Sequence, residues 1–216
     1  MTTQIRTGRG EAPTVAAVHR RSLESVLAEV AVREAPHGIR IIGIDGRSGS
    51  GKSTLAAKLS EVSGAPVIEV DDFVSWNDFA GWWPRFEDEV LRPLLAGDAA
   101  HFRVRDWQGD EFGTSLNGYK TVPWAPLVII EGVTCTRRSA AGLLTYRIWV
   151  QAPEDLRLGR GIQRDGESHR GLWQRWMREE ATFFAEDGTQ GRADLVVDGD
   201  PGVDHDANDH VVVIDG

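Results

Sequence analysis

The chain has 216 residues, enough for one well-buried domain with little left for a second. Its formal net charge of −9 argues against broad binding to nucleic acids or anionic membranes, and no apolar run is long enough for a membrane span or a secretory signal. The single cysteine, Cys135, cannot form an intrachain disulfide, so we expect a reducing cytoplasm and a cysteine that fills core space.

The N-terminal third of the chain predicts a tail, a helix and one strand–loop–helix unit. We expect a flexible tail over residues 1–12, a single domain over 13–216, and a helix over 14–34. Residues 39–44 form a short β-branched apolar run that is typical of a buried parallel strand. Good helix formers follow at 54–60, before stop signals at Gly64 and Pro66.

Between this strand and this helix lies the sequence GRSGSGKS, residues 46–53, with the spacing G-x-x-x-x-G-K-S. In such a loop successive backbone N–H groups surround phosphate oxygens, and the following helix N-terminus favours anions. Lys52 is expected to reach the β- and γ-phosphates and Ser53 to bind Mg²⁺. The predicted nucleotide-binding residues of this loop are Gly46, Gly49, Ser50, Gly51, Lys52, Ser53 and Thr54.

The rest of the chain alternates predicted strands and helices, which implies right-handed crossovers and a parallel sheet with helices on both faces. Residues 106–126 are expected to be rich in loops, and Pro93 to kink or shorten its helix. The other predicted elements are strands at 65–70, 101–105, 127–130, 146–150, 193–198 and 211–214, and helices at 84–96, 153–164 and 170–186.

Three acidic residues, Asp71, Asp72 and Glu131, come directly after predicted strands. Ligands of a parallel sheet bind at the carboxyl ends of its strands, so these side chains are expected to converge near the glycine loop. Phosphoryl transfer needs one carboxylate for Mg²⁺ and one for the proton of an attacking hydroxyl. We assign Glu131 mainly to the metal and Asp71 mainly to the base, with Asp71 a second metal candidate. The alternative, in which Asp72 is the base, stays open because a one-residue shift reverses which side chain points inward.

An arginine-rich segment at residues 157–170 is the candidate lid. Arg157, Arg160 and Arg164 fall on one face of the predicted helix and are expected to point at the phosphates. The glycines at 159, 161 and 166 favour a hinged lid over a merely solvated basic helix. We expect Arg157 to bind nucleotide and Arg160 and Arg164 to neutralise the transition state.

The series GIDGRSGSGKST, VDDF, VRDW, VIIEG and RLGRGIQRD resembles the uridine kinase and pantothenate kinase group of P-loop small-molecule kinases over roughly residues 39–198. The resemblance implies a three-layer α/β P-loop fold with a helical lid and the use of ATP or GTP with Mg²⁺. It also implies that Asp71 acts as the base, that Glu131 helps bind Mg²⁺, and that the arginine segment through Asp165 is the lid.

The acceptor segments depart from the uridine kinase pattern, with RDW at 105–107 and FAGWWPRF at 79–86. Trp76 is expected to border the acceptor pocket with the tryptophans of these segments, where indole faces can stack on a planar ring. Trp149, Trp173 and Trp176 are expected to fill the core. The predicted acceptor-binding residues are Asp72, Trp82, Trp83, Arg105, Asp106 and Trp107.

Three functions fit these motifs. The first is an ATP- or GTP-dependent kinase acting on a hydroxyl of a small molecule, such as a nucleoside. The second is a nucleotide-binding regulatory protein with slow hydrolysis, and the third is a nucleoside monophosphate kinase that uses Arg85 or Arg105 for the extra phosphate. We expect a nucleotide and a small-molecule acceptor as partners, no nucleic acid or membrane, and a homodimer as one assembly option.

Overall fold

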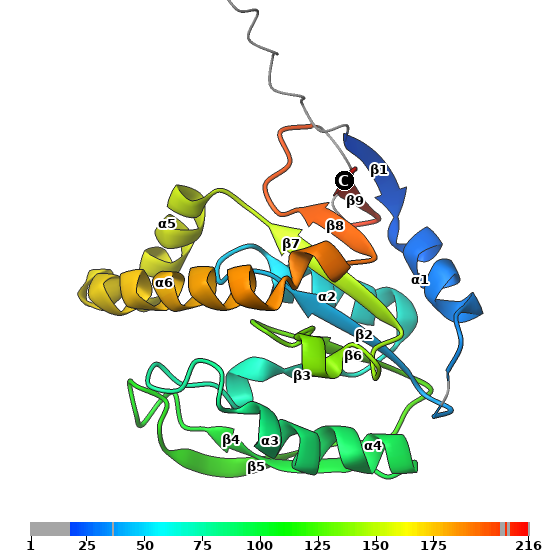
Figure 1. Cartoon of the computed structure of the whole chain (residues 1–216), viewed down its shortest axis with the longest axis horizontal. Helices are drawn as coiled ribbons and strands as arrows, with labels where there is room; N and C mark the ends of the chain where they lie inside the picture. The colour runs from blue at the N-terminus through cyan, green and yellow to red at the C-terminus, as the bar shows by residue number, and fades with distance from the viewer. Residues whose placement is uncertain (1–17, 36, 204–205, 207, 216) are drawn as a thin grey trace, which may run out of the picture.

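A computed structural model describes residues 18–35, 37–203, 206 and 208–215, so the predicted tail at 1–12 lies outside the described residues. The chain forms a three-layer α/β structure around a seven-stranded sheet (Figure 1). Its five strands from β8 to β3 are mutually parallel, while β9 and β1 are antiparallel additions at one edge. The sheet order is β1 (Val18–Ser22), β9 (His210–Ile214), β8 (Leu195–Asp198), β7 (Tyr146–Gln151), β2 (Arg40–Asp45), β6 (Leu127–Glu131) and β3 (Val67–Glu69).

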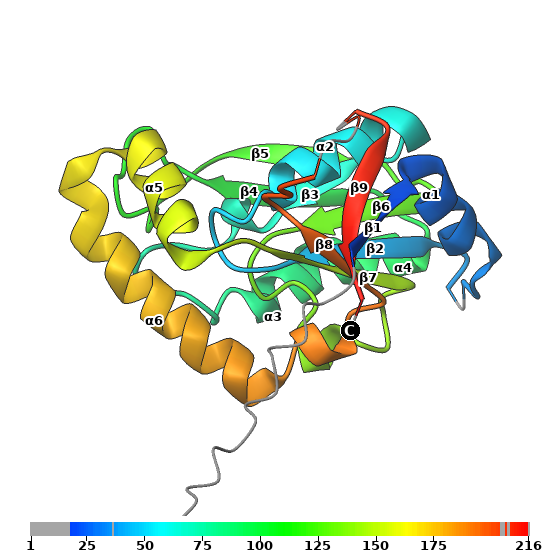
Figure 2. The ribbon, with the colours of Figure 1, turned by 90° about the horizontal axis from the view of Figure 1, so that it is seen from above.

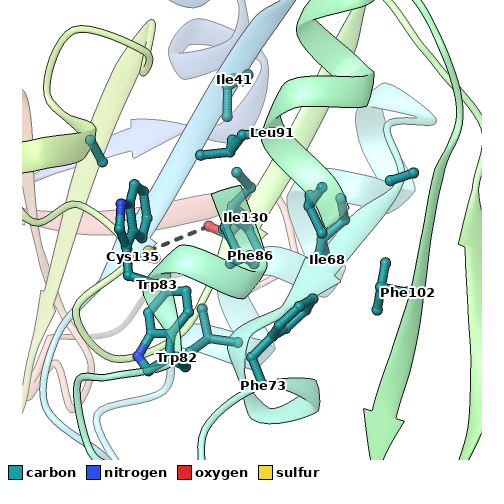
Figure 3. Close-up of a cluster of buried hydrophobic side chains, with 14 of the residues drawn as sticks. Ile41, Ile68, Phe73, Trp82, Trp83, Phe86, Leu91, Phe102, Ile130 and Cys135 are labelled. Carbon is teal, nitrogen blue, oxygen red and sulfur yellow. Dashed lines mark hydrogen bonds between the residues drawn. The ribbon is translucent and has the colours of Figure 1, made fainter. Parts of the chain in front are cut away.

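Buried apolar residues alternate along the central strands and so build one core on each face of the sheet. On β2, Ile42 and Ile44 join the core beneath α1 (Leu23–Val32) and α2 (Lys52–Ser63), whereas Ile41 joins the opposite core. This second core is covered by helices and by the hairpin of β4 (Ala100–Arg105) and β5 (Leu116–Val122), and Cys135 is buried in it as expected (Figures 2 and 3). The three-layer class predicted from the sequence is confirmed.

The predicted helix at 84–96 is present as α3 (Trp83–Phe86), a π-helical turn (Glu87–Leu91) and α4 (Arg92–Ala96) in continuous succession. Pro93 therefore does not end the helix. Proline lacks the N–H that an α-helical turn uses, and the wider turn directly before it accommodates that loss. Gly97, with a φ of 89°, ends the segment.

Two sequence predictions were wrong. Within the helix predicted at 14–34, residues 18–22 form strand β1, which pairs with β9, and Ser22 caps α1 by accepting from the Ser25 N–H at 3.1 Å. Within the predicted loop at 106–126, residues 116–122 form β5. Strand β1 depends on its distant partner β9, whereas β5 pairs with the preceding strand β4 and lacks an apolar pattern, since it buries only Val122.

Helices α5 (Glu154–Asp165) and α6 (Arg170–Asp187) coincide with two predicted helices and lie side by side (Figure 2). They are joined by a short turn at 166–169. A β-carbon at Gly161 of α5 would lie 2.3 Å from the Trp173 ring of α6, so only a glycine permits this approach. No helix in the described ranges is long and apolar enough to cross a lipid bilayer.

The close contact between α5 and α6 predicts a difference between two glycines of the same helix. Gly161→Ala should lower the free energy of unfolding by about 1–3 kcal/mol, because its methyl group would overlap the Trp173 ring. Gly159→Ala is the matched control: a β-carbon there meets nothing within 4 Å, so stability should rise by about 0.5–1 kcal/mol. Urea denaturation of both variants measures the difference. Equal effects at the two positions would contradict the contact.

Candidate active site

A cavity of about 620 Å³ opens at the carboxyl ends of β2, β3 and β6. One wall is the glycine loop, another is formed by acidic residues that follow the strands, and a third by aromatic and arginine side chains of α5, α6 and two loops. Binding sites of parallel α/β sheets lie at this end of the strands. The predicted residues that line the cavity are Gly49, Gly51, Lys52, Ser53, Thr54, Asp71, Trp76, Trp107, Glu131, Arg160 and Arg164.

The glycine loop connects β2 to the N-terminus of α2 and is packed closely from below. A β-carbon at Gly46 would lie 2.1 Å from the Val150 carbonyl oxygen, and one at Gly49 would lie 2.6 Å from the Arg157 carbonyl oxygen. Lys52 is mostly buried, and its Nζ donates to the Arg47 carbonyl at 3.2 Å across the loop. Gly46 and Ser50 lie beneath the cavity rather than on its wall, so they shape the loop rather than face a ligand.

Asp45, the last residue of β2, is a site residue that the sequence prediction missed. Its fully buried carboxylate accepts from the backbone N–H groups of Gly46, Thr134 and Thr136 at 2.7–2.8 Å, and from the Thr136 hydroxyl at 3.0 Å. Burial raises the pKa of this carboxyl, and the hydrogen bonds oppose the rise. Thr134 has a φ of 64°, a strained value for a β-branched residue. Asp45 thus fixes the start of the glycine loop to the turn that follows β6.

Glu131 ends β6 and faces Ser53, whose hydroxyl donates to Glu131 Oε1 at 3.0 Å. Its other oxygen, Oε2, is buried without a hydrogen-bond partner. Burial raises the pKa of Glu131 to about 7, while Lys52 opposes the rise and Asp71 adds to it. An unpaired buried carboxylate oxygen beside a hydroxyl is suited to a cation.

These residues fit the Mg²⁺ that the glycine loop implies. No group of three metal-ligating side chains occurs in the described part of the chain, which agrees with an ion that keeps several waters and binds substrate phosphates. Ser53 and Glu131 would hold it, with Asp71 on the wall of the same cavity.

Asp71 follows β3 in a short helical turn, Val70–Asp72, and its side chain is open to the cavity. Desolvation by the surrounding protein raises the pKa of the Asp71 carboxyl, and the positive charges of Lys52 and Arg164 oppose this rise. Asp72 points away from the cavity and pairs with Lys120 at 2.7 Å. Of the two candidates for the base, Asp71 is therefore the one on the cavity wall.

The arginine segment divides into one buried and two cavity-lining residues. Arg160 lines the cavity and donates to the carbonyls of Gly49 and Gly199, each at 3.2 Å. Arg164 also lines it and forms a two-bond ion pair with Asp165 at 2.7 and 3.0 Å. Arg157, predicted to bind nucleotide, is 2% exposed and lies beneath the loop, so it supports the loop from outside the cavity.

The acceptor side differs from the sequence prediction. Trp82 and Trp83 lie in the core, 2% and 9% exposed, with the Arg137 guanidinium 4.6 and 5.0 Å from their ring centroids (Figure 3). Apolar side chains of α3 and the sheet surround these two rings, because burial of a large aromatic surface is more favourable than its exposure to water. Trp173 and Trp176 are buried as expected, 1% and 6% exposed, and they also line the cavity from α6 beside Trp76 and Trp107.

The segment that carries Asp71 is held by three side chains that donate to consecutive carbonyls. Trp107 Nε1 donates to the Asp71 carbonyl at 2.8 Å. Arg85 donates to the Asp72 carbonyl at 3.0 Å, and Arg105 Nε donates to the Phe73 carbonyl at 2.8 Å. The two arginines, predicted as acceptor or phosphate ligands, do not line the cavity. Asp106 does not line it either, because its carboxylate caps the Gly109 N–H at 2.9 Å.

Several known proteins are similar to this chain, although no protein-family model matches it. A uridine kinase of Borrelia duttonii is 27% identical over 142 residues, which are 59% of this chain and 68% of that protein. A uridine kinase of Borrelia turicatae is 28% identical over the same shares. A solved possible uridine kinase from Bacillus stearothermophilus matches 81% of this chain and 96% of its own with a TM-score of 0.61 and 20% identity. A solved putative fructose transport system kinase from a Silicibacter species matches 80% and 92%, with a TM-score of 0.54 and 20% identity.

The fold is therefore that of the P-loop kinases. The chain is a kinase-type phosphotransferase, as its motifs predicted, and its sequence is similar to those of uridine kinases. The names of these similar proteins refer to different acceptors, a nucleoside and a sugar.

The environment of Glu131 predicts a pH-dependent contribution to stability in the absence of metal. Its folded-state pKa of about 7 exceeds the ordinary glutamate value of 4.5, so the folded protein binds a proton more tightly than the unfolded chain does. The resulting stabilisation is fully present below pH 4.5 and is lost as the pH rises through about 7. Glu131→Gln in EDTA should therefore exceed the wild type in stability by less than about 1 kcal/mol near pH 5 and by roughly 3 kcal/mol near pH 8.

Urea denaturation at both pH values measures this difference. Glu61→Gln, on the exposed side of α2, is the control and should show no comparable change between the two pH values. A constant offset between Glu131→Gln and the wild type at pH 5 and pH 8 would contradict a desolvated carboxyl.

Proposed function

We propose that this protein transfers the γ-phosphoryl group of ATP or GTP to a hydroxyl group of a small molecule, most plainly the ribose of a nucleoside. The observation that carries the proposal is one cavity that holds Lys52, Ser53, Glu131 and Asp71 together with an aromatic wall. The named relatives, uridine kinases, support the nucleoside.

In the proposed reaction Asp71 accepts the proton of the acceptor hydroxyl. The hydroxyl oxygen then forms a bond to the γ-phosphorus as the bond to the bridging β,γ-oxygen breaks, which yields a phosphorylated acceptor and ADP or GDP. Lys52, Arg160 and Arg164 stabilise the charge on the phosphoryl oxygens. Mg²⁺ held by Ser53 and Glu131 would supply further charge neutralisation.

The charges of the acceptor side favour an acceptor without a phosphate. The lysine and arginine residues on the described cavity wall are Lys52, Arg160 and Arg164, which all belong to the nucleotide side. Arg85 and Arg105, the residues that a nucleoside monophosphate kinase could use, are engaged with backbone carbonyls instead. This arrangement weakens the third of the three functions.

The regulatory alternative predicts slow hydrolysis that no acceptor accelerates. An accessible Asp71, two arginines on the cavity wall and an aromatic acceptor side oppose it, because hydrolysis alone requires no acceptor wall. A cytoplasmic location remains part of the proposal, on the sequence grounds given above, with a homodimer as one assembly option.

Substitution of Asp71 tests its role as the base. Asp71→Asn should lower acceptor-dependent turnover by about 100-fold or more, since general-base catalysis contributes that much, while Mg-ATP still binds. ADP release is measured with Mg-ATP or Mg-GTP and a panel of nucleosides, sugars and nucleoside monophosphates. Asp88→Asn, at an exposed ion pair with Arg92, is the matched control and should retain full turnover.

Each outcome of this assay bears on a different function. Acceptor-dependent turnover that survives Asp71→Asn would remove Asp71 as the base. Hydrolysis that no compound of the panel accelerates would favour the regulatory function, and turnover with monophosphates alone would favour the third.

Substitution of Arg105 tests the hydrogen bonds that hold the segment carrying Asp71. Arg105→Gln should lower kcat about tenfold with little change in the KM for Mg-ATP, because Asp71 loses one of its backbone supports. Arg103→Gln is the matched control: Arg103 lies on the same strand but donates to the Leu116 carbonyl within the hairpin. Steady-state kinetics of both variants decide the point, and equal losses would assign the effect to the hairpin as a whole.

A further inference from the structure

A buried carboxylate of helix α6 binds the glycine loop from behind. Glu180 is 0% exposed, and its Oε1 accepts from the backbone N–H of Ser48 at 2.6 Å. Its Oε2 lies 3.4 Å from Arg157 Nη1, and the same guanidinium nitrogen donates to the Ser48 carbonyl at 3.3 Å. The N–H and the carbonyl of Ser48 are thus both bonded to one buried ion pair that is contributed by α5 and α6.

Trp176 connects this ion pair with the acceptor side of the cavity. Its indole Nε1 donates to Ser48 Oγ at 2.9 Å and to Glu180 Oε1 at 3.0 Å. Its ring lies on the cavity wall, with edge contacts to Trp76 at 5.4 Å and to Phe79 at 4.8 Å between ring centroids. One side chain therefore contacts both the acceptor wall and a residue of the phosphate-binding loop.

The neighbouring Trp173 provides a contrast within the same helix. It also lines the cavity and contacts Trp76, at 5.9 Å, but its Nε1 donates to Asp165 Oδ2 at 2.9 Å. No hydrogen bond given by the described residues joins Trp173 to the glycine loop. The two tryptophans thus share the acceptor wall and differ in their connection to the nucleotide side.

The link is sensitive to small displacements, because a buried carboxylate must keep its donors. An ion pair without solvent depends on good geometry and on additional hydrogen bonds, and the loss of one donor leaves the charge partly uncompensated. A shift of the Trp176 ring therefore changes the bonding of Glu180, and with it the position of Ser48 in the loop.

We propose that Trp176 and Glu180 are positioning residues that couple the acceptor wall to the phosphate-binding loop, so that nucleotide affinity depends on acceptor occupancy. An acceptor ring packed against Trp176 acts on the loop through the hydrogen bonds at Ser48. By linkage, the nucleotide changes acceptor affinity by the same factor. The coupling rests on the proposed function, whereas the positioning of the loop does not.

The first arm of the test uses nucleotide alone. Trp176→Phe keeps an aromatic ring and removes the Nε1 donor, and isothermal titration should show Mg-ADP binding weakened roughly three- to tenfold. Trp149→Phe is the matched control, because Trp149 lies outside the cavity and its buried Nε1 has no hydrogen-bond partner among the described residues. It should bind Mg-ADP within about twofold of the wild type. Should Trp176→Phe fail to fold by circular dichroism, Ser48→Ala removes the hydroxyl that accepts from Trp176 and should weaken binding in the same direction. Wild-type Mg-ADP affinity in either folded variant would overturn the proposal.

The second arm adds uridine at saturation as the probe for the acceptor side. In the wild type and in Trp149→Phe, uridine should change the Mg-ADP dissociation constant about fivefold or more, and in Trp176→Phe the ratio should approach one. A ratio of one in the wild type with measurable uridine binding would overturn the coupling. Absence of any uridine binding would count against the nucleoside acceptor of the proposed function, while the first arm alone would still decide whether Trp176 positions the loop.

Discussion

The geometry of the site depends on one buried charge, the Asp45 carboxylate at the end of the central strand. A carboxylate in the interior must be surrounded by donors, and Asp45 obtains them from Gly46 and from the turn at Thr134 and Thr136. This requirement joins the glycine loop to the segment that begins with Glu131. The glycine loop and the Glu131 side of the cavity are consequently fixed to each other before any ligand arrives. The strained backbone of Thr134 is maintained because two N–H groups of its turn are committed to this carboxylate.

The same principle operates on the other side of the loop, where the buried pair of Arg157 and Glu180 satisfies both backbone groups of Ser48. Together with Asp45, this pair holds the inner side of the loop at Gly46 and Ser48. The backbone N–H groups nearer α2 remain on the cavity side, where a helix N-terminus favours phosphate. The loop is thus preorganised by charges that never contact the ligand, which lowers the cost of ordering it during binding.

Sequence reasoning was effective where local pattern determines structure. The central strands, the glycine loop, α5 and α6 have strong local signals, and the ends of β3 and β6 place Asp71 and Glu131 on one cavity. It failed where pairing rather than local pattern decides: β1 exists because the distant strand β9 offers a free edge, and the largely exposed β5 exists because the preceding strand β4 pairs with it. The sequence position of Asp45 could have indicated its role, since an acidic residue at the buried end of an apolar strand requires hydrogen-bond donors around its carboxylate.

The assignment of tryptophans and arginines failed for a different reason, since both residue types can serve the core or the site. Trp82 sits at the start of a helix whose inner face is buried, and its Nε1 has no hydrogen-bond partner within the described ranges. Trp176 is also buried, but its N–H donates to Ser48 of the glycine loop and to Glu180. Arg105 likewise has donors that a nearby run of carbonyls satisfies before any substrate does. Residue type therefore identifies the available chemistry, but the distribution of unsatisfied backbone groups decides which side chains remain free for the ligand. For this chain that distribution leaves cations for the nucleotide and aromatic rings for the acceptor, a division that favours transfer from a charged donor to an uncharged ring-bearing alcohol.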